Sequence, residues 1–155
     1  MTELPKTLLV PVDGSRNSCA AAAYAARMAE RMGAQVQLLY AFPETPLDMF
    51  GTVSESPSRQ NLQYVSSGAF EKLRDESAET AFKAAVDAIG ETAANVDKKV
   101  IAGEPGEAIL QHAKDVQGAM IIMGRRGLSH FQEILMGSTT QRVMHHAKCP
   151  VLVVR

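Results

Sequence analysis

The chain of 155 residues has no tryptophan, few other aromatic residues and little net charge. It has no apolar run of about eighteen residues, so no transmembrane helix or membrane insertion is expected. The formal net charge of −1 argues against the basic field of a nucleic-acid-binding protein. Two cysteines, Cys19 and Cys149, provide neither a disulfide framework nor metal-ligand spacing. Residues 1–6 lack the features of a signal peptide, so a cytoplasmic location is expected.

Short apolar runs alternate with amphipathic or alanine-rich segments along the chain. The runs predict strands at 7–12, 35–40, 96–101, 119–123 and 150–154. Helices are predicted over 17–32, 61–89, 108–116 and 138–146. Residues 43–58, rich in proline and serine, are predicted to be a long loop that is functional or mobile. This order predicts a single doubly wound α/β domain over 1–155, Rossmann-like, with a five-stranded parallel sheet.

Two features follow strands that such a fold would place side by side. Ligands of doubly wound sheets bind beyond the carboxyl ends of the strands, where the strand order reverses. If the chain winds one way through three strands and returns for the last two, the reversal lies between the first and fourth strands. Asp13 follows the first of these strands and Gly124 ends the fourth. Both residues therefore indicate one crevice.

Glycines are concentrated after the fourth predicted strand. The sequence reads Gly-Arg-Arg-Gly at 124–127 and, after nine residues, Gly-Ser-Thr-Thr at 137–140. Glycine lets backbone N–H groups approach an anion, and a helix N-terminus adds unpaired donors and partial positive charge. Arginine can pair with phosphate in a forked geometry. The P-loop and the dinucleotide-binding glycine signature are both missing. The pattern favours a phosphate site of another kind.

These segments resemble the universal stress protein family over nearly the whole chain. The resemblance rests on Leu-Leu-Val-Pro-Val-Asp-Gly-Ser at 8–15, Gly-Glu-Pro at 103–105, the glycine pattern, and Cys-Pro-Val-Leu-Val-Val at 149–154. The ATP-binding branch of that family carries Gly-x2-Gly-x9-Gly-(Ser/Thr), which is complete here. The resemblance implies an adenine nucleotide alpha hydrolase-like fold and a role in stress response. It also implies a homodimer formed through 150–154, in agreement with the apolar character of that terminal strand.

The resemblance also implies a role for each matching residue. The glycines and hydroxyls of 124–127 and 137–140 would hold the phosphates and ribose. Residues 11–13 would line the nucleoside, Ala41 would contact adenine through its backbone, and Met123 would pack nearby. Mg or Mn commonly accompanies the triphosphate, and its ligands stay unassigned. The implied nucleotide-binding residues are Pro11, Val12, Asp13, Ala41, Met123, Gly124, Arg125, Arg126, Gly127, Gly137, Ser138, Thr139 and Thr140.

Each of these signals also has a purely structural reading. The glycines serve equally well as tight turns of an α/β fold, and Asp13 as the N-cap of the first helix. The arginines at 125–126 depart from the family pattern, and they are either phosphate contacts or solvated loop charges. His130, between the two glycine groups, is a further candidate for phosphate contact. The adjacent histidines at 145–146 point apart on a helix and make a poor metal pair.

Three functions are compatible with the sequence. The first is a cytoplasmic ATP-binding stress-response protein that binds ATP, ADP or AMP in the crevice. It would act as a nucleotide-dependent sensor or regulator, through loop 43–58, its dimer surface or an unidentified protein partner. The second is a slow ATPase, although no residue is nominated as a catalytic base. The third is a nucleotide-independent interaction or chaperone-like module. The stress, the partner and the working nucleotide are not determined by the sequence.

Overall fold

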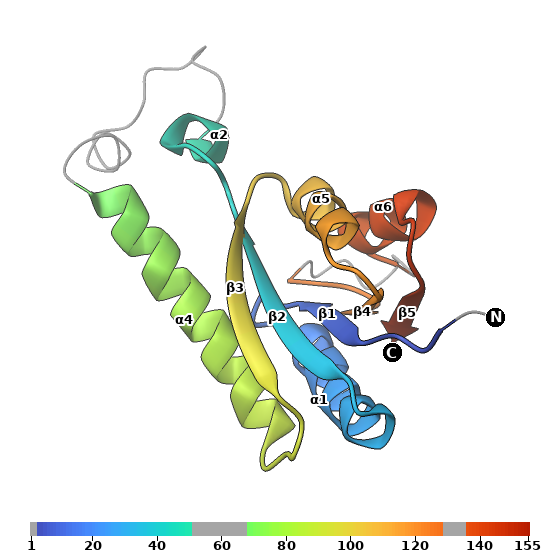
Figure 1. Cartoon of the computed structure of the whole chain (residues 1–155). Coiled ribbons are helices and arrows are strands. Elements are labelled where there is room, and N and C mark those ends of the chain that lie inside the picture. Colours follow the sequence, from blue (N-terminus) through green and yellow to red (C-terminus); the bar gives the residue numbers. More distant parts are fainter. Residues whose placement is uncertain (1–2, 51–67, 129–135) are drawn as a thin grey trace.

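A computed structural model describes residues 3–50, 68–128 and 136–155, which form a parallel sheet covered by helices (Figure 1). All four adjacent strand pairs are parallel, and the strand order is β3-β2-β1-β4-β5. This confirms the predicted doubly wound α/β sheet. The strands are β1 Thr7–Pro11, β2 Gln35–Phe42, β3 Val96–Ala102, β4 Ala119–Gly124 and β5 Val151–Val154. The helices are α1 Arg16–Met32, α2 Pro46–Phe50, α4 Ala69–Ile89, α5 Pro105–Asp115 and α6 Ser138–His146.

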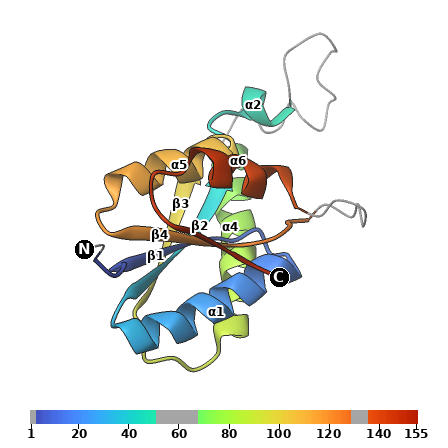
Figure 2. The ribbon, with the colours of Figure 1, turned by 90° about the vertical axis from the view of Figure 1, so that its right-hand side faces the viewer.

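The sheet separates two apolar cores because alternate strand residues face opposite sides. Leu8 and Val36 pack with α1 and α4 on one face, and Leu9 and Leu39 pack with α5 and α6 on the other. Figure 2 shows α5 and α6 on one side of the sheet and α1 on the opposite side. The side of α1 that faces the sheet is mostly alanine, with small side chains that let the helix approach the strands closely. Its buried alanines are Ala21, Ala22, Ala25, Ala26 and Ala29.

The reversal of strand order falls between β1 and β4, as predicted. β1 is followed by β2 and β3 on one side, whereas β4 pairs with β1 on its other side and then with β5. Asp13 and Gly124 are therefore brought to the same edge of the sheet although they are far apart in sequence. This arrangement creates the crevice that doubly wound sheets use for ligands.

One helix starts earlier than predicted and one short helix was not predicted, and capping explains both. The helix predicted over 108–116 begins at Pro105, because the Glu104 carboxylate accepts hydrogen bonds from the N–H groups of Gly106 and Glu107. The predicted loop 43–58 contains the short α2, since Thr45 and Asp48 form a reciprocal cap. Residues 51–58 of that loop lie outside the described residues.

The remaining boundaries shift by a few residues. The described part of the helix predicted over 61–89 is α4, which follows Gly68 in the left-handed region, with φ of 73°; residues 61–67 lie outside the described residues. β2 continues to Phe42 because its last residues pair with β3 as far as Ala102. The predicted strands 7–12 and 150–154 are each one residue shorter.

The sheet has two edge strands with different surfaces. β3 carries exposed Lys98 and Lys99, as expected of a strand at the edge of a sheet. β5 is apolar throughout and pairs with β4 alone among the described strands. None of the helices that the structure describes is both long and apolar enough to cross a membrane.

Candidate functional site

A cleft of about 310 Å³ opens at the carboxyl ends of β1, β2 and β4, at the reversal of strand order. Its walls are completed by the first turns of α5 and α6. Twelve of the thirteen predicted site residues line it; Arg125 is the exception. The twelve are Pro11, Val12, Asp13, Ala41, Met123, Gly124, Arg126, Gly127, Gly137, Ser138, Thr139 and Thr140.

Asp13 supplies a half-buried carboxylate to the cleft. Its Oδ1 atom accepts a hydrogen bond of 2.9 Å from the N–H of Ser15. The N-cap of α1 is Ser15, whose hydroxyl accepts from the N–H of Ser18 at 3.2 Å. The reading of Asp13 as the helix N-cap is therefore wrong, because Ser15 occupies that position. The other oxygen, Oδ2, faces Gly127 so closely that a β-carbon there would collide with it.

Gly124 is a glycine for reasons of packing. A β-carbon at this position would lie 2.7 Å from the carbonyl carbon of Asn17 and 2.8 Å from its carbonyl oxygen. Two of the close neighbours are backbone atoms in the first turn of α1, so they cannot rotate away. The missing side chain lets α1 start directly over the end of β4, which places Asp13 beside the glycine loop.

Hydrogen bonds fix the loop 124–127 against α6 and β5. The N–H of Arg125 donates to the carbonyl of Val154, and its own carbonyl accepts from the N–H of Gly137, both at 2.9 Å. The hydroxyl of buried Thr140 donates to the carbonyl of Gly124, also at 2.9 Å. These bonds hold the start of α6 at the cleft. The N–H of Gly137 and the hydroxyl hydrogen of Thr140 are therefore already used in hydrogen bonds within the protein.

The start of α6 is the main source of anion-binding groups in the cleft. Gly137 is its N-cap and makes no side-chain cap, so the first N–H groups of the helix are not covered by a capping side chain. The first N–H groups of a helix also lack intrahelical acceptors and carry partial positive charge. Ser138 is exposed and Thr139 half-buried at this end, and Arg126 adds a cationic side chain to the same wall. This wall is suited to an anion.

The opposite part of the cleft is apolar. Met123 and Ile109 are almost fully buried at its floor, and Ala41 lies at the end of β2. Apolar side chains of this kind are typical of the part of a ligand site that receives an apolar group. The cleft thus combines an apolar part with an anion-binding part.

The sequence did not identify a third of the lining residues. Leu39 and Tyr40 directly precede Ala41 on β2. The predicted position of Ala41 at the end of that strand could therefore have identified them as neighbours of the ligand. Pro105 and Ile109 are four residues apart on α5, and only the packing of α5 beside β2 brings them to the cleft. The missed residues are Ser18, Leu39, Tyr40, Pro105, Ile109 and Leu128.

The histidines do not form a site among the described residues. The rings of His145 and His146, exposed in the last turn of α6, have centroids 6.4 Å apart. His112 lies on α5, where its Nε2 atom is 2.6 Å from Oε1 of Gln37, and burial lowers its pKa. His130 lies outside the described residues. Within 3–50, 68–128 and 136–155, no three His, Cys, Asp or Glu residues are grouped to hold a metal.

The fold and the cleft define a class: doubly wound α/β proteins with a cleft at the reversal of strand order, where such sheets bind their ligands. The model of the Universal stress protein family matches residues 5–155. A universal stress protein of Thermus aquaticus is 32% identical over 151 residues, covering 97% of this chain and 98% of that protein. The chain belongs to the universal stress protein family, as the motifs predicted.

Solved structures agree with this assignment. UspA from Lactobacillus plantarum matches with a TM-score of 0.77 and 25% identity, covering 99% of this chain and 100% of that one. A universal stress protein in complex with cAMP matches with a TM-score of 0.59 and 23% identity, covering 99% of both chains. The dAMP complex of an Archaeoglobus fulgidus universal stress protein matches with a TM-score of 0.52 and 18% identity, covering all of both chains.

Proposed function

We propose that this protein binds an adenine nucleotide in the cleft and acts as a nucleotide-dependent sensor or regulator of a stress response. The observation that carries the proposal is the convergence of the glycine loop, the start of α6, Asp13 and Ala41 on one cleft at the reversal of strand order. Family members solved with cAMP and with dAMP support an adenine nucleotide as the ligand.

Each part of the nucleotide has a suitable part of the cleft. The phosphates meet the first turn of α6 and the side chain of Arg126. The adenine ring lies against Ala41 and the apolar floor. Asp13 lines the cleft beside Gly127, and its carboxylate can accept hydrogen bonds from ribose hydroxyls. Mg or Mn, when it accompanies a triphosphate, would supply positive charge beside this carboxylate. We assign no catalytic residue to the cleft.

Binding should be tested first on the protein as purified. Small molecules released by denaturation are resolved by ion-exchange chromatography and mass spectrometry, and Mg-ATP, ADP and AMP are then titrated by calorimetry. A ligand at a hundredfold excess over its dissociation constant stabilises the fold by about 2.7 kcal/mol, which a thermal melt detects. Absence of any bound nucleotide, heat of binding or melting shift would contradict the proposal. A time course with ATP tests for slow hydrolysis.

A substitution at Ser138 tests how added negative charge affects phosphate binding while the fold is kept. Ser138→Asp places a carboxylate in the first turn of α6, where it favours the helix dipole but repels a phosphate. We expect Ser138→Asp to fold normally and to bind AMP at least about tenfold more weakly. Ser138→Ala is the matched control, because it removes the hydroxyl without adding charge. Equal affinity of AMP for Ser138→Asp and the original protein would place the phosphate elsewhere.

We also propose that two copies pair through the free edge of β5. The four residues Val151–Val154 are apolar and only half-buried, and an apolar edge strand is stabilised when it is covered by another strand. Sedimentation of the wild-type protein and of Val153→Lys tests this: a dimer is expected for the first and a monomer for the second.

The free thiols of Cys19 and Cys149 are in keeping with a cytoplasmic location.

A further inference from the structure

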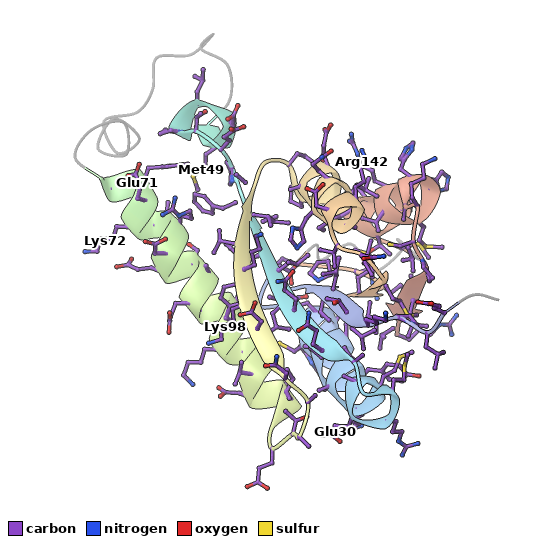
Figure 3. All side chains as sticks on the ribbon, in the orientation of Figure 1. Glu30, Met49, Glu71, Lys72, Lys98 and Arg142 are labelled. Carbon is purple, nitrogen blue, oxygen red and sulfur yellow. The ribbon has the colours of Figure 1, made fainter. Side chains whose placement is uncertain are left out.

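Arg142 joins the two helices whose first turns form walls of the cleft. α5 contributes Pro105 and Ile109 to the lining, and α6 contributes residues 138–140. Arg142 lies on α6, and its guanidinium reaches Glu107 at 3.4 Å and Glu104 at 3.9 Å. Figure 3 shows Arg142 where α5 and α6 meet. The side chain itself does not line the cleft.

The first turn of α5 is shaped to receive this side chain. A β-carbon on Gly106 would lie 2.8 Å from Cδ of Arg142 and 3.4 Å from its Cγ. Gly106 does not have a positive φ, so its backbone conformation does not require glycine. Glycine at this position leaves space for the stem of Arg142 and for the Glu104 carboxylate, whose Oε2 atom would lie 3.4 Å from the same β-carbon. Glu104 also caps α5 with both carboxylate oxygens, which fixes it in position beside the guanidinium.

We propose that Arg142 is a positioning residue, which sets the distance between the apolar and anion-binding walls of the cleft. This inference rests on the proposed function. A nucleotide spans both walls: its base contacts the part bounded by α5 and Ala41, and its phosphate contacts the start of α6. Arg142 acts on such a ligand through the two helices and makes no contact with it.

The solvent exposure of the Arg142 ion pairs limits how much the removal of the guanidinium can weaken nucleotide binding. The side chains of Arg142, Glu104 and Glu107 are 49%, 52% and 75% exposed, so water screens both ion pairs. Exposed pairs of this kind contribute little individually, and we expect a loss of about two- to fivefold in nucleotide affinity when the guanidinium is removed. The two helices also pack against each other, and Ile109 of α5 and Val143 of α6 belong to the same buried apolar core, which keeps the fold intact.

The test compares a ligand that spans both walls with one that reaches a single wall. Dissociation constants of AMP and of adenosine are measured by calorimetry for the wild type, Arg142→Gln, Arg142→Lys, Glu107→Gln and the Arg142→Gln/Glu107→Gln double variant. We expect Arg142→Gln to weaken AMP by about two- to fivefold and adenosine by clearly less. Arg142→Lys should recover part of the loss. The double variant should bind no more weakly than Arg142→Gln, because the two residues act together.

A second variant perturbs the same contact without changing any charge. Gly106→Ala places a methyl group against the stem of Arg142 and should also weaken AMP more than adenosine. The control is Lys83→Gln, which removes an exposed ion pair of 2.9 Å within α4, away from the cleft; its AMP affinity should equal that of the wild type.

Several outcomes would overturn this role for Arg142. These are unchanged AMP affinity in Arg142→Gln, equal losses for AMP and adenosine, or fully additive effects of Arg142→Gln and Glu107→Gln. If the wild type itself binds no AMP, the proposed function fails and the positioning role fails with it. If the wild type binds AMP and Arg142→Gln binds it equally well, only the positioning role fails.

Discussion

Replacing Gly124 with alanine should destabilise the fold before it affects any ligand. The new methyl group would lie 2.7–2.8 Å from three atoms of Asn17, and two of these atoms are backbone. Overpacking a tight interior contact costs about 1–3 kcal/mol. Replacing a glycine also lowers the conformational entropy of the unfolded chain, which offsets about 0.4–1 kcal/mol of this cost. Near the middle of these two ranges the net loss is about 1–2 kcal/mol, which corresponds to a fall of roughly 2–8 °C in Tm for a chain of this size.

The assay is a thermal melt without nucleotide, together with urea unfolding to obtain the free energy of unfolding. Gly137→Ala is the matched control, since a β-carbon there would meet its nearest atoms at 3.5–3.8 Å, an ordinary contact. Its cost should stay below about 1 kcal/mol, the loss expected for alanine at an N-cap. Asn17→Ala should not rescue Gly124→Ala, because the backbone contacts persist. A Tm of Gly124→Ala equal to that of the wild type would refute the packing role of this glycine.

Three further predictions concern stability. Thr140→Val should cost about 1–3 kcal/mol in urea unfolding, because the buried carbonyl of Gly124 loses its donor; Thr80→Val, at an exposed hydroxyl of α4, should cost far less. Hydrogen bonds from the Thr92 hydroxyl and the Ala93 N–H lower the pKa of Glu30 below its ordinary value of 4.5. The folded state therefore gains stability from the ionised carboxylate above pH 4.5 and loses it as the pH falls through the lowered pKa. Melts from pH 7 to pH 3 should show the wild type losing its advantage over Glu30→Gln in that acidic range, and a difference independent of pH would contradict this. Ile122→Ala, at a fully buried position of β4, should cost about 2–5 kcal/mol in urea unfolding, and a loss below 1 kcal/mol would be inconsistent with a packed core.

Much of the fold could be predicted from local patterns. The apolar runs located all five strands, and glycine at 33 marked the end of α1. The alternation of strands and helices predicted a doubly wound parallel sheet. It placed the reversal of strand order between β1 and β4 only on the assumption that the chain winds one way through three strands and returns for the last two, and the structure has that strand order. Boundaries were less accurate where capping decided them, as at Glu104, whose side-chain hydrogen bonds extend α5 by a full turn toward its start.

The residues that line the cleft were predicted best where they are consecutive in sequence. The first glycine group and residues 11–13 were found because they lie at the end of a strand, and the second glycine group because it lies at the start of a helix. Ile109 was missed, since nothing in the sequence of α5 shows that its first turn lies beside Ala41. The same limit applies to Asp13: its position before α1 suggested a helix cap, and only the structure shows Ser15 in that role.

The sequence by itself determined the alternating α/β order, the family, and the chemical groups at the strand ends. Those properties depend on periodicity, turn residues and spacing, which are local along the chain. Tertiary structure alone decided that Gly124 is required by the backbone of Asn17 and that Gly106 makes room for Arg142. These are contacts between residues distant in sequence, and their distances are fixed only when α1 packs on β4 and α6 packs beside α5.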